Sequence, residues 1–163
     1  MPSFPEELIR VKPLHRRLLY FAVALLFLSG VAWTYWNYFV ASRDDSEMAA
    51  KAWAMKIHGG AAMAILVLIG MLLTEHVRVA WRARRNRGNG SLFLSALAVL
   101  TITGYGLYYA AGESLRAWAS WIHLGVGLAL PLLFIFHVWL GKRARTAVLP
   151  QERPRPAAKI NTV

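Results

Sequence analysis

Long apolar runs separated by short charged segments dominate the pattern of hydrophobic and polar positions along this chain. Four runs are long enough to cross a bilayer, at 18–40, 52–76, 91–112 and 117–141; a spanning helix needs about 20 apolar residues. The apolar residues form solid blocks and leave no amphipathic stripe, which is typical of membrane-embedded helices. We therefore predict an all-α fold, an integral membrane four-helix bundle.

The predicted spans divide the chain into three segments. Residues 1–17 are expected to be an N-terminal segment, 18–141 the four-helix transmembrane domain, and 142–163 a basic, flexible tail. A basic stretch before an apolar run can mark a signal peptide, but the first run is too long and lacks a small-residue cleavage site. We predict a retained helix instead, with an aromatic belt at its far end formed by Trp33, Tyr35, Trp36, Tyr38 and Phe39.

Positive charge is unevenly distributed around the spans. The formal net charge is +11, and 15 of the 19 lysines and arginines lie in the N-terminal segment, in the 77–90 loop and in the tail. Because cytoplasmic loops are enriched in lysine and arginine, both termini are predicted to be cytoplasmic. The basic residues flank the membrane and do not share one soluble face, so no nucleic acid partner is expected. The lipid bilayer is the first expected partner.

The chain contains no cysteine, which removes several kinds of site at once. Disulfides, cysteine-ligated iron–sulfur clusters, thiolate zinc sites and covalently attached haem all need thiols. The sequence also lacks the GxSxG, phosphate-loop and HExxH patterns of common hydrolases and nucleotide-binding proteins. No catalytic residue is therefore predicted.

Five histidines carry the candidate chemistry: His15, His58, His76, His123 and His137. An imidazole at membrane depth is costly, and ionisable groups there usually face the bundle interior and have a function. His123 and His137 are 14 residues apart, which is about four helical turns and about 21 Å along the axis. They share one helix face, as the ligands of two stacked haems would.

A partner for His123 follows from the predicted topology. The runs 52–76 and 117–141 point in the same direction, so His58 and His123 both lie near their outer ends. Bis-histidine haem ligation needs imidazoles from facing helices at similar depth. We predict that His58 and His123 bind an outer haem b.

The partner of His137 at an inner haem b stays open between two residues. His76 lies 18 residues after His58, five whole turns, so these two share a face. The rise over 18 residues is about 27 Å, however, whereas 14 residues of the last run supply about 21 Å. His15 lies at the correct end of the first run but just outside it. The shared face favours His76, so the predicted iron ligands are His58, His123, His137 and His76, with His15 as the alternative.

A zinc site, a packing role and a transport role fit the histidines less well than haem ligation does. Closed zinc sites need four ligands close together, whereas these pairs are about 20 Å apart. A haem-free membrane scaffold or assembly subunit, in which the histidines only pack, is the main alternative. A small transporter is disfavoured because the spans show no paired repeat halves and no carboxylate except Glu75, at the exit of the second run. Glycines within the spans allow helices, or a flat macrocycle, to approach the backbone closely; they are Gly30, Gly59, Gly60, Gly70, Gly104, Gly106, Gly125 and Gly127.

Three stretches of this chain resemble a known family. KPLHRRLLYFAVALLFLSG near the start, MKIHGG in the second run and WIHLGVGLALPLLFIFH in the fourth are similar to bacterial cytochrome b561 and to the cytochrome b subunits of nickel–iron hydrogenase and formate dehydrogenase. The resemblance covers roughly residues 12–145. It implies a four-helix dihaem protein of the bacterial inner membrane, an electron-transfer subunit of a quinone-linked oxidoreductase.

The resemblance also implies ligands and partners. The family ligands correspond to His123, His137 and His58, and a first-helix ligand before a Ser/Thr-Gly pair corresponds approximately to His15. This chain departs from the family in having Arg16 where a tryptophan usually follows that histidine, and in the extra candidate His76. The implied partners are a quinone and a redox protein or further subunits, in a homo- or hetero-oligomer.

Overall fold

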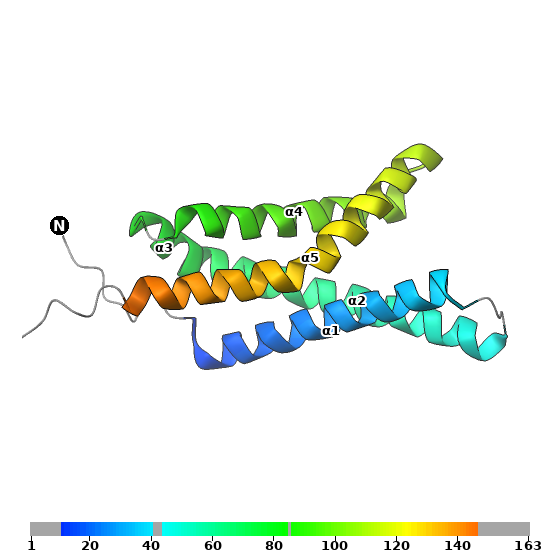
Figure 1. Ribbon diagram of the computed structural model, residues 1–163, viewed down its shortest axis with the longest axis horizontal. Coiled ribbons are helices and arrows are strands. Elements are labelled where there is room, and N and C mark those ends of the chain that lie inside the picture. Colours follow the sequence, from blue (N-terminus) through cyan, green and yellow to red (C-terminus); the bar gives the residue numbers. More distant parts are fainter. Residues whose placement is uncertain (1–10, 41–43, 85, 147–163) are drawn as a thin grey trace, which may run out of the picture.

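The computed structural model describes residues 11–40, 44–84 and 86–146, and this part of the chain is almost entirely helical, with no strand. Figure 1 shows its elements: α1 (Pro13–Tyr38), α2 (Asp45–Leu72), the π-helical turn η2 (Leu73–Val77), α3 (Arg78–Arg82), α4 (Arg87–Tyr109) and α5 (Glu113–Thr146). Within these ranges α1, α2, α4 and α5 are long and apolar enough to cross a membrane. The predicted all-α architecture with four candidate spans is confirmed.

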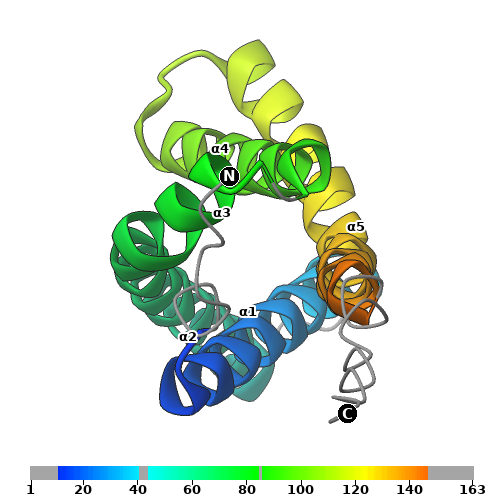
Figure 2. The same ribbon diagram turned by 90° about the vertical axis from the view of Figure 1, so that its left-hand side faces the viewer.

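The four long helices form two antiparallel hairpins. α2 packs along α1, and α5 packs along α4, as short connections require. The hairpins approach each other through α1 and α5, where the rings of Tyr20 and Phe134 meet edge-on with centroids 5.5 Å apart. Seen from one end, the four helices surround a common axis (Figure 2). Side chains of α2 and α5 can therefore meet across the bundle although they belong to different hairpins.

One end of the bundle collects most of the positive charge of the described residues. The beginning of α1, α3, the beginning of α4 and the end of α5 lie together at the left of Figure 1. We call this the arginine-rich end; its basic residues include Arg16, Arg17, Arg78, Arg82, Arg87, Lys142 and Arg143. That this end faces the cytoplasm stays a prediction of the lysine and arginine asymmetry.

Cations on tryptophan rings mark both ends of the spans. At the arginine-rich end, Arg87 lies over Trp81 and Arg143 over Trp139, each 5.2 Å from the ring centroid. At the opposite end, Lys51 lies 5.4 Å from the Trp33 ring and Lys56 4.8 Å from the Trp53 ring. Tryptophan and basic residues are enriched where a membrane protein meets the headgroups. These pairs are consistent with a bilayer core between them.

The helices extend beyond the apolar runs from which they were predicted. α1 begins at Pro13 and not at Leu18, because proline fits the first turn of a helix, where no backbone N–H partner is needed. α2 begins at Asp45, where the Asp44 carboxylate accepts a hydrogen bond of 2.9 Å from the Glu47 backbone N–H. Charged side chains end an apolar run but do not end backbone hydrogen bonding. At the other terminus α5 continues to Thr146, and residues 147–163 of the predicted tail lie outside the described part.

The second predicted span is not a regular α-helix throughout. It passes through η2 and continues as α3 to Arg82, so the expected 77–90 loop is reduced to a short turn before α4. In that turn Arg84 and Asn86 have φ of 55°, and the Arg87 guanidinium donates two hydrogen bonds, of 3.0 and 2.7 Å, to the Trp81 carbonyl. A π turn widens the helix and displaces everything that follows. The five-turn register between His58 and His76 therefore does not hold as predicted.

Small residues line the contacts between helices. The buried residues of the described part are mostly alanines, together with Ser29, Ile65 and Leu130. Small side chains let membrane helices approach closely. Pro131 lies inside α5, and Figure 1 shows this helix changing direction near its middle, as expected where proline removes a helical hydrogen bond.

Candidate functional site

His58 of α2 and His123 of α5 meet inside the bundle, although 65 residues separate them in the chain. Their ring centroids are 6.2 Å apart and their planes are inclined by 69°. Both side chains are half-buried. The juxtaposition predicted for these two residues is therefore present.

The separation of the two rings suits a shared metal ion. An imidazole–metal bond is about 2.0–2.1 Å long, and the ring centre lies about 1.1 Å beyond the nitrogen, so two imidazoles on opposite sides of one metal have centroids about 6.3 Å apart. The observed 6.2 Å agrees with this value. Inclined ring planes are compatible with axial ligation, because each ring can rotate about its own metal–nitrogen bond.

The hydrogen bonds of His58 determine which of its nitrogens carries the proton. Its Nδ1 lies 2.9 Å from the Leu26 carbonyl oxygen and 3.3 Å from Ser29 Oγ. A carbonyl oxygen can only accept, so Nδ1 donates and the proton is on Nδ1. Nε2 of the neutral ring then keeps a lone pair. Metal-ligating histidines commonly donate their other N–H to a carbonyl in this way.

The protonated nitrogen of His123 can be assigned in the same way, although its hydrogen-bond acceptor is a hydroxyl and not a carbonyl. Its Nδ1 lies 3.0 Å from Thr103 Oγ1. The Thr103 hydroxyl donates its own proton to the Val99 carbonyl at 2.7 Å, so its oxygen accepts from the ring. Nε2 of His123 is again left with a lone pair. In both rings, therefore, Nε2 is the nitrogen that is unprotonated.

A glycine lies against each of the two imidazoles. A Cβ on Gly30 would come within 3.0 Å of His58 Cε1, and a Cβ on Gly104 within 3.3 Å of His123 Cε1. A side chain at either position would crowd the ring, so the absence of one favours this close approach. The sequence already indicated that span glycines allow close approach, but it did not single out these two.

The hydroxyl and glycine recur at equivalent places in the two hairpins. Ser29-Gly30 of α1 contacts the histidine of α2, and Thr103-Gly104 of α4 contacts the histidine of α5. The two pairs are 74 residues apart, as are Leu26 and Leu100. Sequence reasoning missed both hydroxyls; a Ser/Thr-Gly dipeptide repeated in the first and third apolar runs was the signal that could have found them.

His137 lies toward the arginine-rich end of α5 in different surroundings. Its ring stacks on Phe93 of α4, with centroids 5.1 Å apart and planes 19° apart, and its Nδ1 lies 3.2 Å from the Asn89 side-chain amide. The amide can face the ring with nitrogen or with oxygen, and these are exchanged by a flip. With the oxygen facing the ring, Nδ1 donates and Nε2 is free, as in His58 and His123. Asn89 was not predicted.

His76 and His15 both lie toward the same end. His76 belongs to η2, and its charged form would interact electrostatically with that of His137. His15 lies in the first turn of α1, and its Nδ1 is buried without a hydrogen-bond partner among the described residues. Each candidate partner of His137 is thus supported by one observation.

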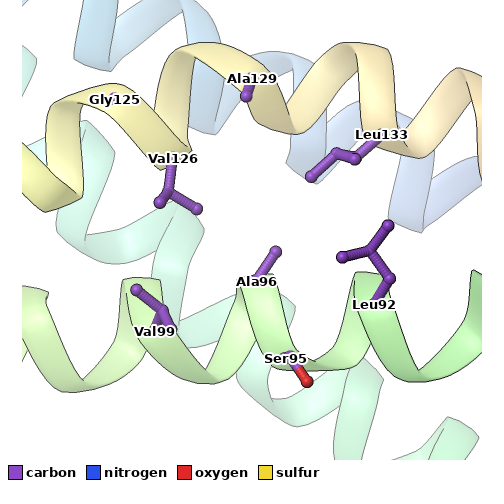
Figure 3. A pocket seen from close by; sticks show the side chains of 8 residues that line it. All are labelled: Leu92, Ser95, Ala96, Val99, Gly125, Val126, Ala129 and Leu133. Carbon is purple, nitrogen blue, oxygen red and sulfur yellow. The ribbon is translucent and has the colours of Figure 1, made fainter.

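An apolar cavity lies between α4 and α5 at the depth between His123 and His137. Its volume is about 380 Å³. Figure 3 shows side chains of α5 pointing toward those of α4 across this space, with the Ser95 hydroxyl directed away from it. The cavity is lined by Leu92, Ser95, Ala96, Val99, Gly125, Val126, Ala129 and Leu133. Its surface suits a flat apolar group better than an ion.

No set of three or more histidine, cysteine, aspartate or glutamate side chains gathers around one point within the described ranges. A metal held only by side chains usually needs three or four such ligands. A macrocyclic metal needs only one or two from the protein. The donor set of the two-histidine site therefore fits a macrocyclic metal better than a bare ion.

Comparison with protein-family models, with curated proteins and with solved structures finds no match to this chain. What can be said of its function therefore rests on its own residues and their geometry.

Proposed function

We propose that this protein is a b-type dihaem membrane cytochrome that passes electrons between a quinone pool and a redox partner across the bilayer. The observation that carries the proposal is the pairing of His58 with His123 at a centroid distance of 6.2 Å. Both rings are in the tautomer that leaves Nε2 available, and each lies against a glycine. A haem, when bound, would supply a reversible one-electron couple.

The residues of the chain supply position and surroundings for such a group. His58 and His123 would hold the group, and the carbonyl of Leu26 and the hydroxyl of Thr103 orient their rings. The open groove between α4 and α5 is lined almost entirely by apolar side chains, so α4 and α5 place no charged group in it between the two histidine levels. Low polarity near a redox group is one of the ways in which a protein sets its potential.

A second haem would use His137 with either His15 or His76, and depth favours His15. The contact between Tyr20 and Phe134 gives α1 and α5 a common reference level. His15 lies five residues from Tyr20 toward the arginine-rich end, about 7.5 Å, and His137 three residues from Phe134 in the same direction, about 4.5 Å. The two are therefore within about 3 Å in depth.

Two further observations bear on this choice. His15 and Asn89 are also 74 residues apart, the same offset as that of the two Ser/Thr-Gly pairs. His15 is therefore the α1 equivalent of Asn89, the residue of α4 that contacts His137. Within the described part, Nδ1 of His15 is buried and accepts or donates no hydrogen bond, so that nitrogen is not used in holding the helices together. His76, whose charged form would interact electrostatically with that of His137, would then donate or accept a proton for a quinone.

The location follows from the same proposal. Four candidate spans make the protein multi-pass. The asymmetry of lysine and arginine supports an orientation with the arginine-rich end and both termini in the cytoplasm, and the family resemblance supports the inner membrane of a bacterium. Reporter fusions test this topology. A reporter that needs export should be inactive at Val163 and active when inserted between Asp44 and Glu47; export-dependent activity at Val163 would contradict it.

The alternative of a haem-free scaffold treats the imidazoles as packing groups whose Nδ1 atoms are already satisfied. Haem content separates the two functions. The purified full-length protein should contain two haems per chain, with a low-spin spectrum that a quinol reduces. The matched control is Ile102→Ala, a change at a 70% exposed position of α4, which should leave the haem content unchanged. A chain that takes up no haem, even when haem is supplied during synthesis, would rule out the proposal.

A further inference from the structure

The repeated Ser/Thr-Gly pairs contribute more than close packing. In each hairpin the first helix presents a hydroxyl and, three residues earlier, a backbone carbonyl to the histidine of the second helix. In α1 these are Ser29 and Leu26, at 3.3 and 2.9 Å from His58 Nδ1. In α4 the hydroxyl is that of Thr103, at 3.0 Å from His123 Nδ1. The Leu100 carbonyl, three residues earlier, also interacts electrostatically with this ring. The same arrangement thus serves both histidines of the pair.

The hydroxyl protons are already used within their own helices. Ser29 donates to the Leu25 carbonyl and Thr103 to the Val99 carbonyl, each at 2.7 Å. Serine and threonine in membrane helices commonly form such bonds to the preceding turn. Each hydroxyl oxygen is therefore left to accept a hydrogen bond, and because the ring atom that contacts it is Nδ1, that nitrogen must carry the proton to donate one.

We propose that Ser29 and Thr103 are positioning residues that hold His58 and His123 in the Nδ1–H tautomer, with both Nε2 atoms unprotonated. Use of these lone pairs by a haem iron rests on the proposed function; the tautomers do not. The two positions are unequal, because the closer acceptor is the carbonyl for His58 and the hydroxyl for His123. Thr103 is therefore the more important of the two.

The experiment compares the full-length, haem-free protein with single variants by ¹⁵N NMR of ring nitrogens in detergent. Nitrogen shifts distinguish protonated from unprotonated ring nitrogens directly. Thr103→Val removes the hydroxyl at nearly constant volume, and Thr103→Ser restores it. The matched control is Thr101→Val, because Thr101 donates to the Leu97 carbonyl at 2.8 Å in the same way but is exposed and not bonded to a histidine. Thr103→Ala serves if the valine variant does not fold.

The wild type and the Thr103→Ser and Thr101→Val variants should show His123 with Nε2 unprotonated. Thr103→Val should shift a measurable fraction of His123 to the Nε2–H tautomer, and Ser29→Ala should shift His58 by less. The inference would be overturned if His123 kept the same tautomer in Thr103→Val as in the wild type. It would also be overturned if the wild type itself carried the His123 proton on Nε2.

A second readout separates this inference from the proposed function. Loss of a hydrogen bond to a ligating histidine typically lowers metal affinity 10–100-fold, so haem titration into Thr103→Val should show a loss in that range at one site, restored by Thr103→Ser. If no variant binds haem but the tautomers respond as expected, the inference stands and the cytochrome proposal fails. If haem binds but the tautomers do not respond, the cytochrome proposal stands and the inference about Ser29 and Thr103 fails.

Discussion

The two histidine levels of this bundle are built differently. At the His58–His123 level, each ring is held by the first helix of its own hairpin, through a hydroxyl, a carbonyl and a glycine. At the His137 level, α4 supplies an amide and a stacked phenylalanine. The other hairpin contributes two candidates there, one on α1 and one in the π turn η2.

The difference shows which contacts define a site in an open bundle. Helices within a hairpin pack along their length, so a ring seated against its hairpin partner is held in place by direct contacts. The two hairpins touch mainly through α1 and α5, so pairing across them depends on depth and helix phase. Close to the arginine-rich end the π turn alters that phase. The proposal for the first site therefore rests on contacts, and the proposal for the second on depth alone.

Removing either member of the well-defined pair should have the largest effect. His58→Ala and His123→Ala should each lower the haem content from two per chain to one, because an axial imidazole is lost. His137→Ala should remove the other haem, so that the double variant His123→Ala/His137→Ala contains none. Haem per chain, measured as the pyridine complex, checks this. An unchanged ratio in both single variants at the first site would end the assignment.

The two candidates at the second level should separate into different phenotypes. His15→Ala is expected to convert one low-spin haem to a high-spin or lost haem, as His137→Ala does, because depth pairs these residues. His76→Ala is expected to keep both low-spin signals and to slow reduction by quinol. Electron paramagnetic resonance and stopped-flow reduction measure the two effects. The opposite split would identify His76 as the ligand and show that the π turn compensates for the difference in depth.

The glycines test how tightly the first level is packed. A Cβ on Gly30 would meet the His58 ring at 3.0 Å, and overpacking a filled site typically costs about 1–3 kcal/mol. Gly30→Ala should lower the thermal midpoint and weaken one haem, with a smaller effect for Gly104→Ala, where the contact is 3.3 Å. Gly70→Ala is the matched control, since nothing lies within 4 Å of a Cβ at that position. Equal behaviour of all three variants would contradict the proposed packing.

The smallest effect is expected outside both levels, at the N-cap of α2. The hydrogen bond from the Glu47 backbone N–H, aided by the Ser46 hydroxyl, holds the pKa of Asp44 below its ordinary value of 3.8. The charged cap therefore stabilises the fold above pH 3.8, and this contribution is lost as the pH falls through the lowered pKa. Asp44→Ala should remove a small part of the acid sensitivity and leave both haems in place. Thermal midpoints at several pH values measure it; altered haem content would show that the cap acts on the site.

The sequence predicted the features that depend on composition over long stretches. Solid apolar blocks indicated four spans, and histidines at a 14-residue spacing indicated one helix face; the pairing of His58 with His123 followed from a common depth. These inferences need only the regular rise and twist of an α-helix. They failed where the helix is irregular, as at η2, and where charged residues continue a helix beyond its apolar run, as at Pro13 and Asp45.

The hydroxyls of Ser29 and Thr103 were missed for a different reason. The sequence prediction concerned paired repeat halves and not single recurring positions: Leu26, Ser29 and Gly30 recur as Leu100, Thr103 and Gly104. The offset is 74 residues on the first helices but 65 between His58 and His123, because the helix ends and the connection between Ser29 and His58 are longer than those between Thr103 and His123. Only packing reveals that the same three positions contact equivalent histidines.

The most direct test of the central claim is the spectrum of a chain in which only the His58–His123 pair remains. The variant His15→Ala/His76→Ala/His137→Ala keeps every hydroxyl, carbonyl and glycine that holds this pair. It should bind one haem per chain, and electron paramagnetic resonance should show a single low-spin species with two axial imidazoles. A variant that is folded and helical but binds no haem, or binds it only in a high-spin form, would contradict the account.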